Sequence, residues 1–264
     1  MFRRGLIGFA AAVSALIAGV LPAQAITMGT IDGGLHPEVG AVIAEYVQPG
    51  QKDVLCSGSL IATRVFLTAA HCTAYLESLG INDVWVTFAP SFTSSSPLIH
   101  GSYVTDPNYG YSGQGGASDP NDLAVILLDK AVRGVTPVTL PRAGALDAID
   151  LQSQTFTAVG YGTVRDIKTT GPNAFYFDSV RRYATQYFLS LEPAWLNLSE
   201  NPSTGSGGTC YGDSGGPHFL GGTSSRYQVA ITVTGDTACR ATDKTYRLDT
   251  PSARNFLGNY VTLP

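Results

Sequence analysis

A serine near the C-terminal end of the chain lies in a stretch that could serve nucleophilic chemistry. Residues Gly212–Pro217 read GDSGGP, with Asp213 directly before Ser214 and Cys210 upstream in the same segment. Glycine, aspartate, serine and proline all favour turns, so a simple turn accounts for part of this composition. It does not account for both an acid and a cysteine at these positions. The alternative is a reactive serine whose glycine-flanked backbone approaches a substrate closely.

A serine hydroxyl becomes a good nucleophile when a base removes its proton, and that base is usually a histidine oriented by a carboxylate. The histidines of the chain are His36, His71, His100 and His218. His71 lies beside Cys72 at the end of the apolar run LTAAHC, which makes it the candidate base. Taken alone, a buried structural histidine would explain the same pattern.

A candidate for the carboxylate stands at the start of a strongly apolar run. Asp122 follows Asn121 and precedes Leu123–Leu128, which reads LAVILL. This position would place a carboxylate at the mouth of a buried strand. An ordinary turn aspartate that begins a strand is the alternative for Asp122 taken alone.

The order of these residues separates the classes of serine hydrolase. Ser214 also fits the G-x-S-x-G pattern of α/β-hydrolases, but those proteins place their acid and histidine after the serine. Here only His218 follows, too close in sequence to return on a separate loop. The subtilisin order needs an early acid, which Asp32 could supply, and alternating strands and helices, which the sequence lacks. The remaining order is His71, Asp122 and Ser214.

The elements that must position these residues are mostly strands. Short apolar, β-branched runs alternate with turn signals from 30 glycines and 15 prolines, which predicts an all-β barrel or sandwich. The runs are 39–47, 55–61, 65–69, 84–88, 123–128, 155–159, 182–189, 227–233 and 245–248. A short helix is possible from His71, and a C-terminal helix is expected after Thr250 and Pro251. A division into two halves is expected near 137–144.

The first 25 residues have the features of a secretory signal peptide. Arg3 and Arg4 precede an apolar stretch from Leu6 to Leu21, and Ala23–Ala25 supplies an A-x-A cleavage site. The stretch is short for a transmembrane anchor, which needs about 20 residues. We therefore expect a protein that is secreted or periplasmic, with no membrane association after cleavage.

Export and charge limit the remaining chemistry. The 4 cysteines are even in number, which favours disulfides in an exported protein, and spacing alone leaves three pairings open. No C-x-x-C pair exists, so a metal site is not expected. The formal net charge is −4 and no basic run follows the N-terminus, so nucleic acid is not an expected partner.

The chain resembles the chymotrypsin/trypsin family of serine proteases. The residues that carry the resemblance are LTAAHC at 67–72, NDLAVILL at 121–128, CYGDSGGP at 210–217 and the turn Gly160–Gly162. The resemblance implies two packed six-stranded antiparallel Greek-key barrels with a short C-terminal helix. The first barrel, within 26–140, would carry His71 and Asp122, and the second, within 141–264, would carry Ser214. We therefore expect a secreted, monomeric endopeptidase that acts on proteins or peptides without a cofactor.

The resemblance also implies roles for single residues. Ser214 would attack the scissile carbonyl and form an acyl-enzyme, His71 would transfer the proton, and Asp122 would orient His71. The N–H groups of Gly212 and Ser214 would form the oxyanion hole. The implied disulfides are Cys56–Cys72 and Cys210–Cys239. A protease-like binding protein without turnover is the alternative function.

Asp213 has a separate implied role. In the family, this acid pairs with the ammonium group of a new N-terminus. Ile26 and Ile31 are the candidates, and the distance to the next strand favours Ile26, which directly follows the expected cleavage after Ala25. Export cleavage would then create the activating terminus.

The expected specificity pocket includes Gly208, Thr209 and Lys244. In trypsin-like members, an aspartate six residues before the nucleophile binds lysine or arginine at P1, the substrate residue before the scissile bond. This chain has Gly208 there, so no strict preference for arginine or lysine is expected. Lys244 could bind an acidic P1 side chain, fill the pocket, or pair with Asp236 or Asp243. It could also be a solvated loop lysine.

Overall fold

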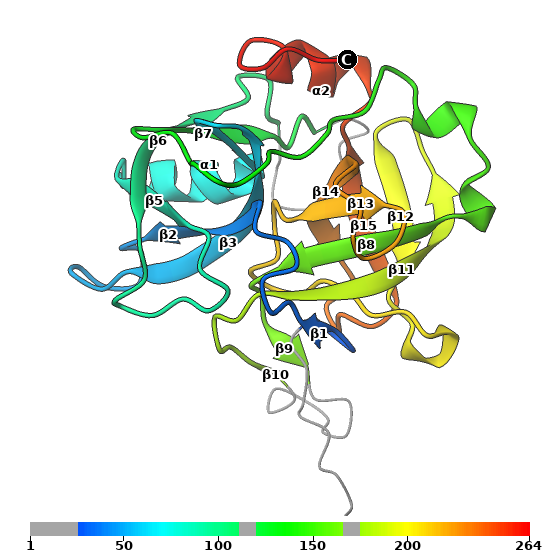
Figure 1. Ribbon diagram of the computed structural model, residues 1–264, viewed down its shortest axis with the longest axis horizontal. Coiled ribbons are helices and arrows are strands. Elements are labelled where there is room, and N and C mark those ends of the chain that lie inside the picture. Colours follow the sequence, from blue (N-terminus) through cyan, green and yellow to red (C-terminus); the bar gives the residue numbers. More distant parts are fainter. Residues whose placement is uncertain (1–25, 111–119, 166–174) are drawn as a thin grey trace, which may run out of the picture.

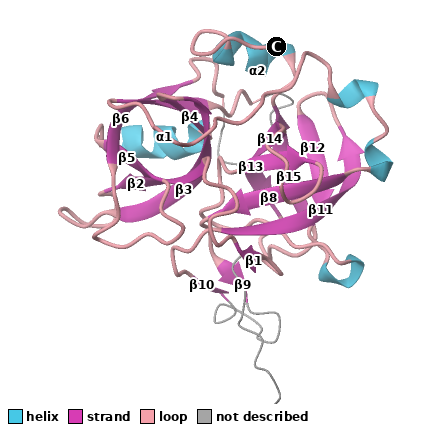
Figure 2. Cartoon of the chain, viewed as in Figure 1, coloured by secondary structure: helices cyan, strands magenta, loops and turns pink. Residues whose placement is uncertain are grey.

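The computed structural model describes residues 26–110, 120–165 and 175–264. The expected signal peptide lies outside these residues. The described chain folds into two β-barrels that lie side by side, with the C-terminal helix α2 (Pro251–Leu257) packed across one end (Figures 1 and 2). Within this part of the chain, no helix is long and apolar enough to cross a membrane.

The first barrel is a closed antiparallel sheet of six strands. In spatial order, these are β2 (Val39–Ala44), β3 (Asp53–Ala62), β4 (Val65–Thr68), β7 (Ala124–Leu128), β6 (Ile99–Thr105) and β5 (Val84–Thr87). Its interior is filled by aliphatic and aromatic side chains, including the fully buried Leu60, Phe66 and Val125. The short helix α1 (Ala70–Ser78) follows β4 directly, as the sequence allowed.

The second barrel is also closed by six antiparallel strands. They are β8 (Thr155–Gly160), β11 (Arg182–Leu191), β12 (Trp195–Ser199), β15 (Thr242–Arg247), β14 (Gln228–Gly235) and β13 (Pro217–Leu220), and β8 closes the ring by pairing with both β11 and β13. The short β1 (Thr30–Ile31) extends this sheet along β11. The strands β9 (Val164–Arg165) and β10 (Phe175–Tyr176) form a separate pair.

The remaining elements are short. Within the described ranges, 3-10 helices cover 146–148, 151–153 and 202–204. The C-terminal helix begins where expected, because the Thr250 hydroxyl accepts a hydrogen bond of 3.3 Å from the Ala253 N–H and Pro251 occupies the first turn. Its buried residues Ala253, Phe256 and Leu257 join the hydrophobic core. The predicted all-β class with two six-stranded barrels is confirmed.

Candidate active site

The pairing of β4 with β7 brings His71 and Asp122 together. These strands run antiparallel with Thr68 opposite Ala124, so the end of β4 lies beside the beginning of β7. His71 follows the end of β4, in the first turn of α1, and Asp122 lies two residues before the first residue of β7. Residues that are distant in sequence therefore meet at one edge of the first barrel.

Asp122 holds the histidine through two hydrogen bonds. The His71 backbone N–H donates to Asp122 Oδ1 at 2.9 Å, and His71 Nδ1 lies 2.9 Å from Asp122 Oδ2. The carboxylate is completely buried, whereas the imidazole is 23 % exposed. In the neutral ring, a proton on Nδ1 that is donated to this carboxylate leaves Nε2 as the basic nitrogen.

Ser214 reaches this region on a turn of the second barrel. The turn is closed by hydrogen bonds from the Asp213 N–H to the Cys210 carbonyl at 3.0 Å and from the Gly216 N–H to the Asp213 carbonyl at 2.8 Å. Gly215 lies against the chain that leads into His71, because a Cβ at Gly215 would overlap Thr68 Oγ1 and lie 2.6 Å from the Ala69 nitrogen. Its φ of +79° adds a second reason for glycine.

Ser57 in β3 connects the same turn to the first barrel. Its N–H donates to the Ser214 carbonyl at 2.9 Å, and its hydroxyl donates to the Gly212 carbonyl at 3.0 Å. The hydroxyl also accepts a hydrogen bond of 2.9 Å from the Tyr161 N–H. Sequence reasoning missed this residue, because nothing in the run LCSGSLI distinguishes Ser57 from a serine that only packs in a strand.

The N–H groups of Gly212 and Ser214 have no acceptor among the described residues. Gly212 adopts a φ of +95°, which turns its peptide in a way that L-residues rarely allow. Two unpaired N–H groups of one turn are therefore available to an oxygen atom beside Ser214.

Asp213 is buried beneath this turn. Its carboxylate accepts hydrogen bonds from the Gly162 N–H at 2.8 Å and the Cys210 N–H at 2.9 Å. Burial raises its pKa to about 7, against the effect of these two hydrogen bonds. No cation forms an ion pair with Asp213 in the described part of the chain.

Ile26 lies in the same barrel and is completely buried. The following residue, Thr27, accepts a hydrogen bond of 2.9 Å from the Gly208 N–H and donates its hydroxyl to the Cys239 carbonyl at 2.8 Å. Hydrogen bonds with Gly208 and Cys239 thus hold the segment that begins at Ile26 beside the residues that precede Ser214 in the sequence.

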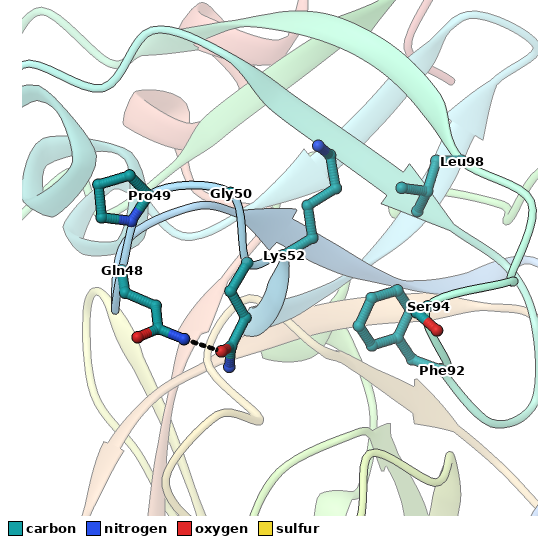
Figure 3. A pocket seen from close by; sticks show the side chains of 8 residues that line it. Gln48, Pro49, Gly50, Lys52, Phe92, Ser94 and Leu98 are labelled. Carbon is teal, nitrogen blue, oxygen red and sulfur yellow. Dashed lines mark hydrogen bonds between the residues drawn. The ribbon is translucent and has the colours of Figure 1, made fainter.

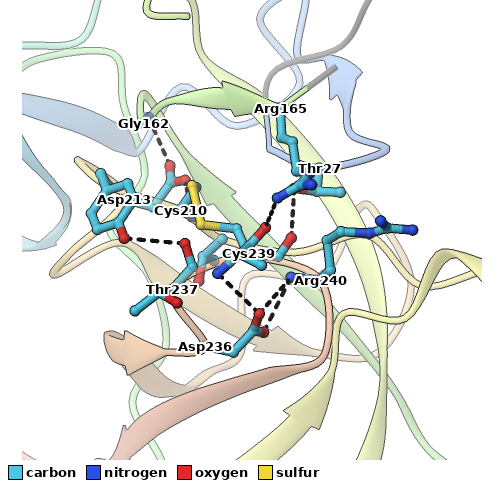
Figure 4. Close-up of a disulfide and its surroundings, with 12 residues drawn as sticks. Thr27, Gly162, Arg165, Cys210, Asp213, Asp236, Thr237, Cys239 and Arg240 are labelled. Carbon is cyan, nitrogen blue, oxygen red and sulfur yellow. Dashed lines mark hydrogen bonds between the residues drawn. A yellow bond between two sulfur atoms is a disulfide. The ribbon is translucent and has the colours of Figure 1, made fainter. Parts of the chain in front are cut away.

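The two disulfides are those that the resemblance implies. Cys56–Cys72 links β3 to α1 beside His71, and Cys210–Cys239 links the Ser214 turn to the segment after β14. Figure 4 shows the second disulfide with Asp213, Thr27 and Asp236 around it. Cys56, Cys72 and His71 lie within 4.8 Å of one another, but the disulfide leaves no thiolate to bind a metal ion.

A cavity of about 220 Å³ opens beside Ser214. It is lined by Ser214, by Thr209–Tyr211, by residues 232–237 and by Cys239. A larger hollow of about 550 Å³ lies in the first barrel between residues 48–52 and 92–98, and it contains none of the predicted site residues (Figure 3). The cavity beside Ser214 can therefore hold a group bound next to this hydroxyl.

The predicted pocket residues fall in three different places. Thr209 lines the cavity. Gly208 lies behind it, where a Cβ would be 2.5 Å from Glu200 Cβ. Lys244 was expected at the pocket and lies elsewhere: its Nζ is 4.6 Å from the centre of the Trp195 ring and 3.9 Å from Glu192 Oε2. The reason is strand alternation, since β15 turns Asp243 into the barrel and Lys244 away from it.

Comparisons with known proteins agree with this geometry. The family model described as Trypsin matches residues 41–256. A chymotrypsin from Phaedon cochleariae is 26% identical over 202 residues, which cover 75% of this chain and 69% of that protein. A trypsin-like protease from Streptomyces glaucescens is 31% identical over 194 residues, which cover 70% and 67%. The chain belongs to the trypsin family and is a serine endopeptidase that acts on protein substrates.

Proposed function

We propose that this chain is a secreted endopeptidase that cleaves peptide bonds with His71, Asp122 and Ser214 as its catalytic triad. The observation that carries the proposal is the buried Asp122 carboxylate, which holds His71 through two hydrogen bonds at the side of the turn that bears Ser214. The disulfides fit an extracellular protein. We infer that the enzyme acts as a monomer with domains at 26–140 and 141–264, and binds neither nucleic acid nor membranes.

The reaction proceeds in two halves. Ser214 Oγ attacks the scissile carbonyl carbon while His71 Nε2 takes the hydroxyl proton, and Asp122 stabilises the resulting imidazolium. The N–H groups of Gly212 and Ser214 bind the carbonyl oxygen as it becomes negative, each worth about 3–4 kcal/mol in the transition state. His71 then gives its proton to the leaving amine. A water molecule, activated by His71, hydrolyses the acyl-enzyme and regenerates Ser214.

The proposed triad is tested by labelling. A fluorophosphonate probe should modify the mature enzyme at Ser214 and abolish hydrolysis of a casein substrate, and the Ser214→Ala variant should resist both. Ser59→Ala is the matched control, since Ser59 lies in a buried strand and should not affect labelling. Labelling of a different serine, or hydrolysis that persists in Ser214→Ala, would contradict the proposal.

We further propose that removal of residues 1–25 activates the enzyme. The freed Ile26 ammonium would pair with Asp213, whose buried carboxylate has no cation among the described residues. Thr27 already holds this segment against Gly208 and Cys239. N-terminal sequencing of the active form should begin at Ile26, and an active form that begins at Thr30 or Ile31 would contradict this.

A further inference from the structure

Glu200 lies directly behind the wall of the cavity beside Ser214, in contact with Gly208 and with the wall residue Thr209. A Cβ at Gly208 would lie 2.5 Å from Glu200 Cβ and would overlap Glu200 Cγ and Cδ. The side chain of Glu200 therefore occupies the space that a side chain at position 208 would fill. The carboxyl that position 208 lacks is supplied from another element.

Alternation along β12 explains how Glu200 comes to lie inside the barrel. Leu196 and Leu198 are completely buried in the second core cluster, and Glu200 follows them at the same spacing of two residues. Glu200 is accordingly 1 % exposed. The sheet directs a carboxyl group toward the barrel interior, where a leucine would be the usual choice.

The Glu200 carboxyl is joined to the cavity wall through Thr209. Thr209, which lines the cavity together with Ser214, donates its hydroxyl to Glu200 Oε1 at 3.3 Å. Glu200 Oε2 is buried and has no hydrogen-bond partner in the described part of the chain. A buried carboxyl oxygen without a donor carries a desolvation cost that a donor from a bound ligand would remove.

The surroundings of Glu200 contain acids without a compensating cation. Asp243 reaches it from β15 and Asp236 from the turn after β14, and Asp243 in turn lies 3.4 Å from His218 Nε2 of β13. Within the described residues, no lysine or arginine forms an ion pair with any of these three acids. A cation bound behind the cavity wall would therefore supply the compensating charge that these acids lack in their ionised forms.

We propose that Glu200 binds the cationic side chain of a lysine or arginine at P1. This inference rests on the proposed function, because it places the P1 residue in the cavity beside Ser214. The P1 ammonium or guanidinium would donate to the unpartnered Glu200 Oε2, with Thr209 holding Oε1. Glu200 would then supply the acid that trypsin-like members carry as an aspartate at position 208.

The same geometry makes the preference depend on pH. Burial, followed by the charges of Asp243 and Asp236, raises the pKa of Glu200 to about 10, so the empty site holds a proton at neutral pH. A cation at P1 favours the ionised carboxylate, and its binding releases that proton. The ratio of kcat/KM for a cationic P1 residue to kcat/KM for a neutral P1 residue should therefore rise as the pH increases from 7 toward 10. At lower pH, the enzyme should still accept neutral P1 residues.

The test compares two peptide substrates that differ only in P1 arginine and P1 citrulline, its uncharged isostere. At pH 8 the wild-type enzyme should favour arginine by roughly 100-fold in kcat/KM, in keeping with the loss of one partner of a buried charge pair. Glu200→Gln should bring the arginine value down to the citrulline value and leave the latter unchanged. Glutamine closely resembles the protonated acid, so this variant should fold.

Two further variants sharpen the comparison. Glu192→Gln, which removes an acid near Lys244 on the outer face of the same barrel, should leave the ratio unchanged. The double variant Glu200→Gly with Gly208→Asp should restore most of the preference for arginine. Removing the whole Glu200 side chain, including the Cβ that would lie 2.5 Å from a Cβ at position 208, makes room there, and the backbone at Gly208 is not in the positive-φ range.

A binding measurement separates this inference from the proposed function. Benzamidine, a flat cation, should bind to the Ser214→Ala variant in calorimetry and should bind at least about tenfold more weakly when Glu200→Gln is added. This readout needs no turnover. An enzyme that is labelled at Ser214 yet shows equal rates for arginine and citrulline would overturn the role of Glu200 and leave the endopeptidase intact.

Discussion

The two barrels share an architecture and differ in what they bury. The first is filled with aliphatic and aromatic side chains, such as Leu60, Phe66 and Val125. The second encloses ionisable groups, and burial raises the pKa of Glu200 to about 10 and lowers the pKa of His218 to about 3. Buried charges cost free energy unless they are neutralised or paired. The first barrel thus serves as a rigid frame for His71 and Asp122, whereas the second retains costly polar groups near its cavity.

The largest expected effect concerns the pair at the edge of the first barrel. Asp122→Asn should lower kcat roughly 10⁴-fold with little change in folding. The amide has one acceptor oxygen for the two His71 donors, and its NH2 group facing Nδ1 would favour the wrong tautomer. Steady-state kinetics and thermal unfolding would measure both effects. Asp129→Asn is the matched control, since Asp129 holds His100 at 2.7 Å on the exposed surface of the same barrel. Equal losses in both variants would show that the buried pair has no special role.

A smaller effect is expected where the two barrels meet. Ser57→Ala removes the hydroxyl that joins the Gly212 carbonyl to the Tyr161 N–H, and kcat should fall roughly 2- to 10-fold with KM nearly constant. Ser57→Thr should recover part of the loss.

Ser59→Ala serves as the control for this contact, because Ser59 lies in the same strand and donates to Gln228 Oε1 at 2.6 Å, away from the Ser214 turn. It should affect stability and leave kcat unchanged. If KM rises in Ser57→Ala while kcat holds, the hydroxyl does not position the Gly212 peptide.

The smallest effect is a change in acid stability that involves the second barrel alone. The folded-state pKa of His218, about 3, lies below its ordinary value of 6.5, so the unfolded state binds more protons between these two values. Stability from this group is complete above pH 6.5 and declines as the pH falls toward 3. His218→Gln should remove this decline, a difference of about 2 kcal/mol at pH 5 in urea unfolding.

His100→Gln provides a comparison of opposite sign. Hydrogen bonding to Asp129 raises the pKa of His100, so its contribution is present below the ordinary pKa and disappears as the pH rises through the folded value. Its exposure makes that contribution small. A decline on acidification that is the same in His218→Gln and the wild type would contradict the neutral, buried state of His218.

The sequence predicted most of the first barrel and missed parts of the second. Runs of β-branched residues identified β2, β3, β4, β5 and β7. The strands β6, β12 and β13 were not identified. His100 and Gly101 interrupt β6, β12 is short with alternating polar residues, and β13 begins at Pro217 inside a segment that resembles a turn.

The predicted site residues divide in a similar way. Motifs indicated the proposed triad residues His71, Asp122 and Ser214, because these residues lie in short segments with distinctive neighbours. The contacts of Glu200 and Ser57 form only when distant strands meet, so no motif marks these two residues. One signal was available: the alternation of Leu196, Leu198 and Glu200 places the acid on the buried face of its strand. Lys244 was misplaced because the register of β15 was unknown.

The complete burial of Ile26 has a practical consequence for producing the protein. A purification tag joined directly to Ile26 would begin at a buried residue, so its first residues would have to pass between packed side chains to reach the solvent. Pro264 is exposed at the opposite end of the chain and can carry such a tag freely. Recombinant material intended for assays therefore needs a removable fusion partner ahead of Ile26 and any permanent handle after Pro264.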